Sequence, residues 1–344
     1  MCYKKLNMSK KNSNVILKKA FKESLNLREV YLDFKKRINK FKNNIFIVAV
    51  SGGPDSLALA ALSKFYCSEY KSKFFYVLIN HNIRKNSLSE AKQVKSLLKK
   101  NGINLIILSN KEKIKKNIQK KARDIRYELL SKFCIRKKIS YILTAHNLED
   151  QVETFFLRLS RGSGLTGLSA MKVITRISNK ISLCRPLLNV KKKTLVEISK
   201  ISFGKFFKDP SNKNEKYLRT KIRNLKKPLK QSGISYDQVI KSINNLASSK
   251  ATLDQYVSKT FKDLIKKSGG KLRIDLSKFK KLNDDIQISV INRAIKLTKK
   301  NYYNPRAKKA HNLAKNLGSK KFTKSTLGGC TFYKERDQIW VKTE

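Results

Sequence analysis

A short turn rich in glycine and hydroxyl residues has the residue types that phosphate binding needs. It consists of Ser51, Gly52, Gly53, Pro54, Asp55 and Ser56. An apolar run precedes it and a helical pattern follows it, so backbone N–H groups and a helix dipole would converge on one anion. Asp55 could then hold a Mg²⁺ ion that bridges phosphate oxygens. The turn lacks the lysine of a GxxxxGK[ST] P-loop, and ordinary turn and N-cap chemistry uses the same residue types.

A second polar segment, 144–154, combines a histidine with carboxylates. Asp150 and Glu153 are three residues apart and share a helix face, where one could bind Mg²⁺ and the other an ammonium group. His146 could donate a hydrogen bond to a substrate or to a phosphate oxygen. The alternative is that these acids, together with Glu149, only favour the helix N-terminus electrostatically. For Glu149 we prefer this alternative.

Strands and helices alternate around both polar segments, from residue 45 to about residue 188. Runs of β-branched and aromatic residues predict strands at 45–50, 74–79, 103–108 and 141–145. Apolar residues at three and four spacing predict helices at 55–70, 89–100, 117–137 and 148–160. The pattern predicts an α/β fold with an open, parallel, Rossmann-like sheet, whose carboxyl edge is where ligands bind. Both polar segments would lie at that edge.

Four regions are predicted along the chain. They are a basic N-terminal arm (1–30), a catalytic α/β domain (31–228), a smaller helical domain (229–317) and a β tail with a Gly-Gly turn (318–344). For the arm we favour disorder over a transit sequence or a later start at Met8. A turn at 209–212 and Pro228 mark the end of the catalytic domain.

Composition indicates a polyanionic partner. Lys and Arg number 79 against 24 Asp and Glu, for a net charge of +55. Clustered cations bind phosphates by releasing counterions, which favours nucleic acid, although a compositional bias toward lysine is an alternative. No long apolar run or signal-peptide core is visible, so we expect no membrane contact. Five scattered cysteines without a CxxC motif predict reduced thiols in a cytoplasmic protein.

Five motifs in a fixed order resemble those of the tRNA(Ile)-lysidine synthase family, within the PP-loop or N-type ATP pyrophosphatase class. They are SGGPDS, AHNLEDQVET, RGSGLTGLSAM, RPLL and DPSN. The match extends through NHNIRKNS (80–87), IQKKARDIRYELL (118–130) and YLRTKIRNLKKPL (217–229). SGGxDS alone is shared by many PP-loop enzymes, whereas the whole series is specific. The family carries two adjacent acids before the glutamine, and this chain departs at the first, Glu149, whose role is left open.

The resemblance implies a ligase that forms a carbon–nitrogen bond in two steps. ATP would adenylate the C2 oxygen of the wobble cytidine in an isoleucine tRNA with a CAU anticodon, releasing pyrophosphate. The ε-amine of L-lysine would then displace AMP and give lysidine. Reaching a base in a folded anticodon loop requires splaying it out.

The resemblance also implies roles for single residues. Asp55 and Asp150 would bind the Mg²⁺ of ATP, and Arg126 would contact phosphate and assist nucleotide transfer. Glu153 and His146 would lie near the incoming lysine.

Contacts to tRNA are expected from arginines, because planar guanidinium groups suit phosphate oxygens. The candidates are Arg158, Arg161, Arg219 and Arg223, although a single arginine is usually a solvated surface residue. Glycines at 162, 164 and 167 would shape a turn around the site. The basic second domain would hold the tRNA, and a homodimer is left open.

Two other functions are weighed. A PP-loop tRNA thiolase would also activate a base oxygen, but it needs sulfur delivered through cysteines or an iron–sulfur cluster. The missing CxxC argues against it, while Cys134 and Cys184 remain conceivable nucleophiles. A non-catalytic RNA-binding protein would bind tRNA with a steep salt dependence and release no pyrophosphate.

Overall fold

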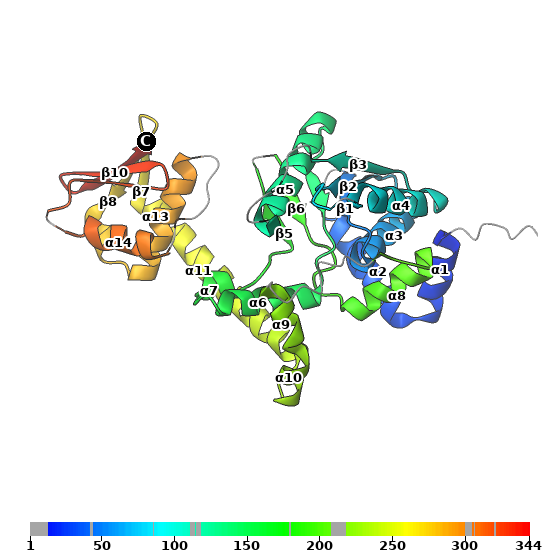
Figure 1. The fold of residues 1–344 in the computed structure, drawn as a ribbon. Helices are drawn as coiled ribbons and strands as arrows, with labels where there is room; N and C mark the ends of the chain where they lie inside the picture. The colour runs from blue at the N-terminus through cyan, green and yellow to red at the C-terminus, as the bar shows by residue number, and fades with distance from the viewer. Residues whose placement is uncertain are drawn as a thin grey trace, which may run out of the picture. The chain divides into compact units, whose positions relative to one another are not determined.

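Two compact units make up the chain, which we analysed as a computed structural model (Figure 1). The units are Met1–Asn244 and Asn245–Glu344. The structure describes residues 13–41, 44–84, 86–110, 114, 118–178, 180–207, 218–299, 305, 307–319 and 321–344. The turn predicted at 209–212 lies outside the described residues.

The first unit is built on a six-stranded sheet in the order β3-β2-β1-β4-β6-β5. The strands are β1 Ile45–Val50, β2 Lys73–Asn80, β3 Leu105–Ser109, β4 Tyr141–Leu143, β5 Ile174–Arg176 and β6 Ser182–Cys184. All neighbours pair in parallel except β5, which is antiparallel to β6. The predicted parallel α/β class is confirmed. Strands β5 and β6 were not predicted, because strands of three residues carry no clear periodic signal.

Helices cover both faces of this sheet. The helices of this unit are α1 Ser13–Glu23, α2 Leu25–Ile38, α3 Pro54–Glu69, α4 Ser87–Lys100, α5 Ile118–Lys137, α6 Leu148–Leu159, α7 Leu165–Leu168, α8 Lys192–Phe203, α9 Leu218–Asn224, α10 Lys226–Gln231 and the beginning of α11 Tyr236–Leu264. Helices α1 to α4 and α8 contribute to the core on one face of the sheet and α5 to the core on the other, whereas α6 packs with α11 in a separate small core. On β1, Phe46 and Val48 belong to a core shared with α3, α4 and α8, whereas Ile47 belongs to a second core shared with α5. Covering on both faces explains why the run at 45–50 is continuously apolar.

Part of the predicted N-terminal arm is folded, so the prediction of disorder is wrong for residues 13–30. Leu17 and Phe21 of α1 and Leu27 of α2 are buried in the core on the α3 side of the sheet. Leu17 and Phe21 are four residues apart, which is the spacing of one face of an amphipathic helix. Residues 1–12 lie outside the described part of the chain.

The boundary between the units differs from the one expected at Pro228. Pro228 lies within α10, and Val239 and Ile243 of α11 join Leu148 and Val152 of α6 in a small core. The division falls after Asn244, inside α11. Residues 229–244, which were predicted to begin the second domain, therefore belong with the α/β unit through tertiary packing, which local turn signals do not report.

The second unit contains a five-stranded antiparallel sheet in the order β7-β8-β11-β10-β9. Its elements after α11 are β7 Ile265–Ser268, β8 Lys271–Asp275, α12 Leu276–Lys280, α13 Asp284–Thr298, α14 Ala307–Leu317, β9 Lys324–Leu327, β10 Cys330–Glu335 and β11 Gln338–Thr343. The predicted β tail with its Gly-Gly turn is present. The helical prediction is wrong at 265–275, where a hairpin turns at Gly269 and Gly270, both at positive φ. Strand β8 pairs with β11, so the tail completes a sheet begun earlier in the chain.

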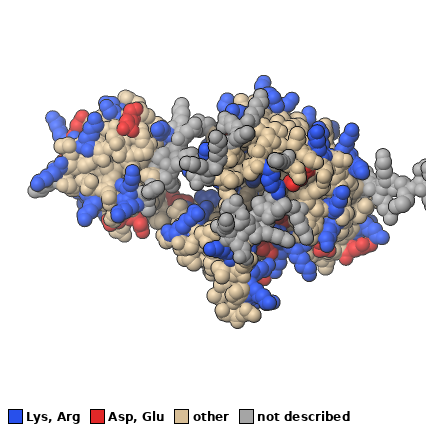
Figure 2. All heavy atoms as spheres, viewed as in Figure 1, with Lys and Arg blue, Asp and Glu red and all other residues tan. Residues whose placement is uncertain are grey.

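Lysine and arginine side chains are spread over both units on the face shown in Figure 2, with few acidic side chains among them. This distribution agrees with the net charge of +55. Within the described residues, no helix combines the length and apolar character that crossing a bilayer requires.

The packing of α1 and α2 can be tested through the side chains of α2. We expect Phe34→Ala to lower the free energy of unfolding by about 3–5 kcal/mol, because this ring is fully buried. Leu32→Ala is the matched control on the same helix, since Leu32 is 47% exposed and should change stability by less than about 0.5 kcal/mol. Denaturant unfolding measures both, and equal small effects would contradict the placement of α2.

Candidate functional site

The SGGPDS turn connects β1 to α3 and is held together by its own hydroxyl groups. The buried Ser56 Oγ accepts hydrogen bonds from Ser51 N and Ser51 Oγ, both at 3.1 Å, and donates to Gly53 O at 2.9 Å. Gly53 is the N-cap of α3 and offers no side chain to the first turn. The N–H groups of that turn therefore face no capping side chain, which is the arrangement that binds anions.

Gly52 is required by the shape of this turn. Its φ is +84°, and a Cβ atom there would lie 2.6 Å from Val94 Cγ2. Its carbonyl accepts a hydrogen bond from Phe207 N at 3.0 Å, so the turn is fixed from outside as well. A side chain at this position would both strain the backbone and overlap α4.

Asp55 has one carboxylate oxygen that the described part of the protein leaves without a hydrogen bond. Its Oδ1 atom is buried and has no hydrogen-bond partner within the described residues. The pKa of Asp55 is raised to about 6, mainly by burial. The charge of Lys192 and a hydrogen bond with Asn147 oppose this rise, while the charges of Asp150 and Glu149 contribute to it. A buried, unpaired carboxylate oxygen beside other acids is the environment that a bound cation would relieve.

The donor set around Asp55 fits Mg²⁺ better than a metal enclosed by protein alone. Among the described residues, no group of three or more His, Cys, Asp or Glu side chains could form a complete cage. Mg²⁺ commonly binds through one or two carboxylates and takes its remaining ligands from water and substrate phosphates. Asp55 with Asp150 meets that requirement next to an anion-binding turn.

Asp150 is already engaged at the beginning of α6. Asn147 Oδ1 accepts from Asp150 N at 3.0 Å, and Asp150 Oδ2 accepts from Asn147 N at 3.1 Å, which is a reciprocal capping box. The other oxygen, Oδ1, lies 3.5 Å from an Nη atom of Arg219. One carboxylate therefore both caps the helix and faces the charged groups of the site.

Glu149 lies on α6 but stabilises the N-terminus of another helix, α8. Its Oε2 accepts a hydrogen bond from Lys192 N, the first residue of α8, at 2.9 Å, and its Oε1 lies 3.5 Å from Lys226 Nζ. The preferred interpretation from sequence was that Glu149 stabilises a helix N-terminus. It does so for α8, a helix distant in the sequence.

Glu153 forms the most buried ion-pair cluster of the site. Its side chain is only 5% exposed and accepts from Arg219 Nε at 2.9 Å and from Arg223 Nε at 2.5 Å. Burial by itself lowers the pKa of Arg223, but the hydrogen bond and charge of Glu153 outweigh it and raise the pKa. Glu153, which was expected near lysine, thus pairs with Arg219 and Arg223, which were expected at tRNA phosphates. These ion pairs link α6 to α9.

His146 lies in a strongly positive environment. Its Nδ1 is 2.9 Å from Thr144 Oγ1. Burial lowers the pKa of His146 to about 3, and the charges of Arg185, Arg219, Arg123 and Arg126 act in the same direction. The imidazole is therefore neutral at physiological pH and can form hydrogen bonds, but it is a weak proton acceptor.

Arg126 has an exposed side chain on α5, and its charge acts on two histidines of the site. The second is His81, which directly follows β2. Burial lowers the pKa of His81 to about 4, with Arg126 contributing, and its buried Nδ1 has no partner within the described residues. His81 stands in the NHNIRKNS motif, but no role was assigned to it from the sequence.

Arg158 holds the glycine-rich segment after α6, and Arg185 holds the chain that follows this segment. Arg158 donates from one Nη atom to the carbonyls of Gly167 at 2.6 Å and Ala170 at 2.9 Å. The buried Arg185 donates to Lys172 O at 2.7 Å. Arg158, expected to contact tRNA, is thus engaged with the backbone, whereas Arg161 at the end of α6 is exposed.

These groups converge because four adjacent strands end at one edge of the sheet. In spatial order β2, β1, β4 and β6 are followed by His81, the turn at 51–56, His146 and Arg185. No role was assigned to His81 or Arg185 from the sequence. Only His81 had a signal of position, because it closely follows the strand predicted at 74–79, whereas β6, which precedes Arg185, was not predicted. The arrangement combines an anion-binding turn, two carboxylates suited to a cation and a set of arginines, which suits the chemistry of a nucleoside triphosphate.

Comparison with known proteins decides among the PP-loop enzymes. A model of the PP-loop domain family matches residues 27–229. A tRNA(Ile)-lysidine synthase of Wolbachia pipientis wMel is 33% identical over 323 residues, which is 92% of this chain and 75% of that protein. Another, from Wolbachia sp. subsp. Brugia malayi (strain TRS), is 32% identical over 88% of this chain and 71% of that protein. The chain belongs to the tRNA(Ile)-lysidine synthase family.

Membership of the tRNA(Ile)-lysidine synthase family confirms the family predicted from the motifs. The PP-loop domain implies the use of ATP, and the family name identifies a tRNA-modifying ligase. A solved structure of the U34-tRNA thiolase NcsA from Methanococcus maripaludis with its [4Fe-4S] cluster has a TM-score of 0.54. It covers 65% of this chain and 79% of that one at 18% identity, so the likeness shows the fold alone.

The cysteines in this lysidine synthase family member are poor candidates for the nucleophile of a thiolase. Cys134 and Cys184 are buried, and burial raises the pKa of each thiol to about 12. A thiol rather than a thiolate is then present at neutral pH, and the thiol is a weak nucleophile. Both side chains instead contribute to the packing around the sheet.

The two glycines of the turn give a matched pair of variants. We expect Gly52→Ala to lower the free energy of unfolding by about 1–2 kcal/mol or more, because φ is positive and Val94 lies in the way. Gly53→Ala should cost little, since Gly53 has an extended backbone and its nearest neighbour to a new Cβ is Ser51 Oγ at 3.7 Å. Thermal unfolding of both variants measures the difference, and equal effects would contradict the turn geometry.

The protonation of His146 can be followed by NMR, because the chain has only three histidines. We expect the imidazole ¹⁵N shifts of His146 and His81 to stay at their neutral values down to about pH 5, given pKa values of about 3 and about 4. Stability should accordingly fall as the pH drops below the unfolded-state pKa of about 6.5, since only the unfolded chain then gains protons. His146→Gln assigns the signal, and a titration midpoint near the unfolded value would contradict the positive environment.

Proposed function

We propose that this chain ligates L-lysine to C2 of the cytidine at wobble position 34 of the isoleucine tRNA with a CAU anticodon. ATP would first adenylate the cytidine and release pyrophosphate, and lysine would then displace AMP, so that the tRNA reads AUA codons. One observation carries the proposal: in a member of the tRNA(Ile)-lysidine synthase family, an anion-binding turn ends beside the buried, unpaired Oδ1 of Asp55. The reaction requires phosphate and cation binding at one place, and this edge of the sheet offers both.

ATP binding is assigned to the residues at the end of β1. The turn at 51–56 would hold the phosphates through its backbone N–H groups, with Asp55 and Asp150 as ligands of Mg²⁺. Bound Mg²⁺ would neutralise charge that builds on the departing pyrophosphate. Arg126 would contribute to the same neutralisation, and His81 lies close enough to Arg126 to feel its charge.

Lysine activation follows from the positive environment around His146. An amine attacks only when it is unprotonated, and nearby cations lower the pKa of an amine as they lower that of an imidazole. The arginines that act on His146 would therefore favour the neutral ε-amine of lysine beside it. His146 would orient that amine by a hydrogen bond, since its own pKa of about 3 makes it a weak base.

The cluster of Glu153, Arg219 and Arg223 offers both charges that a free amino acid carries. Glu153 could share its carboxylate with the α-ammonium group of lysine, while an arginine meets the α-carboxylate. Arg219 and Arg223 were expected at tRNA phosphates, and their Nε edges are occupied by Glu153. Contact with lysine and contact with tRNA are therefore coupled at this cluster.

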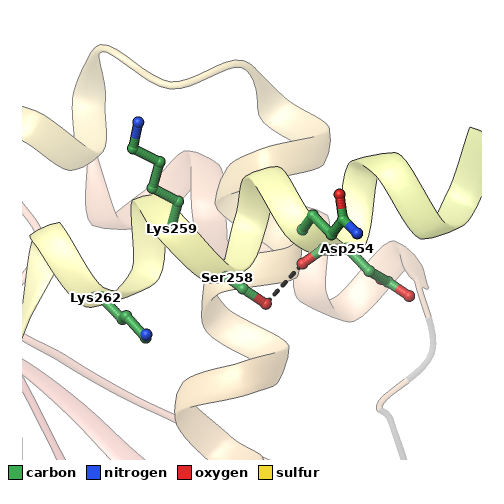
Figure 3. Close-up of a pocket in the computed structure, with 5 residues that line it drawn as sticks. Asp254, Ser258, Lys259 and Lys262 are labelled. Carbon is green, nitrogen blue, oxygen red and sulfur yellow. Dashed lines mark hydrogen bonds between the residues drawn. The ribbon is translucent and has the colours of Figure 1, made fainter.

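Binding of tRNA is assigned to Arg161 and to the second unit. A pocket of about 440 Å³ lies along α11, lined by Asp254, Gln255, Ser258, Lys259 and Lys262 (Figure 3). Ser258 donates to Asp254 O at 2.7 Å and accepts a hydrogen bond from Arg293. Lys259, Lys262 and Arg293 would supply cations to the phosphate backbone, which contributes most of non-specific affinity. Dimer formation remains a prediction that light scattering can test.

Removing the charge of either carboxylate tests the proposed function. We expect Asp55→Asn and Asp150→Asn to abolish tRNA-dependent pyrophosphate release and incorporation of radiolabelled lysine into a CAU-anticodon isoleucine tRNA. An asparagine at position 150 keeps an oxygen for the capping box, so loss of activity would not reflect an uncapped helix. The affinity for tRNA should stay nearly unchanged. Asp237→Asn is the control, because Asp237 is exposed and pairs with Lys191.

Asp55→Asn should also raise stability at pH 8 by about 1–3 kcal/mol. The pKa of Asp55 is raised from 3.8 to about 6, so ionising it destabilises the fold above pH 6 and has no effect below the unfolded pKa. The gain should therefore disappear at acid pH. Retained activity in either variant would refute the proposed metal site, and label in a tRNA without the anticodon cytidine would refute the proposed specificity.

A further inference from the structure

An apolar pocket lies between α6 and α9, apart from the charged groups of the candidate site. Its volume is about 320 Å³. It is lined by Phe156 and Leu159 of α6 and by Leu218, Lys221, Ile222 and Leu225 at α9. On α9 the apolar members recur at four and three spacing, so one stripe of this helix faces the pocket.

Around the pocket, several large apolar side chains are exposed to water. Leu159 is 49% exposed, and Leu218 and Leu225 are each 43% exposed. Single exposed leucines need no explanation, but three around one hollow form a contiguous patch, and such patches mark interaction sites. The described lining contains no acidic side chain and includes the cation of Lys221.

The same two helices carry the charged groups of the candidate active site. Phe156 follows Glu153 by three residues on α6, and Leu218 and Ile222 directly precede Arg219 and Arg223 on α9. Residues three apart share a helix face and residues one apart lie on adjoining faces, and Glu153 already joins the two helices through both arginines. The pocket therefore adjoins the site at which a cytidine would be modified.

We propose that this pocket receives an unpaired base of the tRNA anticodon loop that neighbours the target cytidine. Single-stranded bases bind proteins by laying flat apolar faces on aromatic and aliphatic side chains, with cations nearby for the phosphates. Phe156 and the leucines supply the apolar surface, and Lys221 supplies the cation. A chain of net charge +55 favours such a polyanion over an apolar protein partner. The inference rests on the proposed function and identifies how the flanking base is held.

The test uses the full chain and anticodon stem-loops of the CAU isoleucine tRNA carrying 2-aminopurine at single loop positions flanking the cytidine. We expect one position to change its fluorescence on binding, and the change to be lost in the double variant Leu159→Gln/Leu225→Gln. Both side chains are half-exposed, so the variant should keep its thermal stability, which is measured alongside. Loss of a stacked base should weaken stem-loop binding about tenfold.

Two further variants make the result specific. Leu32→Gln is the matched control, because Leu32 is 47% exposed on α2, and it should leave fluorescence and binding as in the wild type. Lys221→Gln should reduce the slope of log affinity against log salt by about one, as expected for a single lost phosphate contact.

The outcomes separate this inference from the proposed function. If the double variant binds every stem-loop as the wild type does, the inference is refuted even though the wild type ligates lysine. If the double variant changes only the oligomeric state in light scattering, the pocket binds a second copy of the chain, and the inference is again refuted. If the wild type transfers no lysine while the pocket-dependent fluorescence change persists, the proposed function fails and the base contact stands.

Discussion

Parallel pairing of β1 with β2 on one side and β4 on the other is the constraint on which the site depends. This pairing makes the strand ends coincide, so the turn at 51–56 lies between the segments that follow the neighbouring strands. The turn is fixed further by Gly52, whose positive φ and close approach to Val94 leave no room for a side chain. Displacement of β1 would separate the backbone N–H groups of this turn from the carboxylates beside it.

Nearly every acidic side chain of the site caps a helix or forms an ion pair, and this basic chain has few other acids. Glu149 caps α8, Asp150 caps α6, and Glu153 joins α6 to α9 through two arginines. Asp55 is the exception, because its Oδ1 has no partner within the described residues and its pKa is raised to about 6. The buried carboxylate of Asp55 lowers stability when it is ionised, at the place where a cation and a triphosphate would bind. Such a cost is expected of a functional residue.

The arginines of the site have two effects: some bind backbone carbonyls, some shape the electrostatic potential, and Arg185 does both. Arg158 binds the backbone carbonyls of Gly167 and Ala170 in the glycine-rich segment, and Arg185 binds that of Lys172, which follows this segment. Burial keeps His146 neutral by lowering its pKa, and the charges of Arg185, Arg219, Arg123 and Arg126 act in the same direction. In the proposed reaction an amine must be unprotonated to react, and this potential would favour it without requiring a strong base.

Local patterns in the sequence were sufficient for the parallel α/β class, the long elements around β1 and the motifs that identify the family. These are properties of residue type and short spacing, and continuous apolar runs report strands covered on both faces. They could not show that Glu153 pairs with Arg219 and Arg223, because the partners lie far apart in the chain. Strands β5 and β6 were too short for a periodic signal, and the hairpin of β7 and β8 joins a sheet with strands from the end of the chain. Sequence alone therefore determined which chemistry was available. Tertiary structure decided which residues form ion pairs and which are neutral, because burial and long-range contacts determine hydrogen bonds and pKa values.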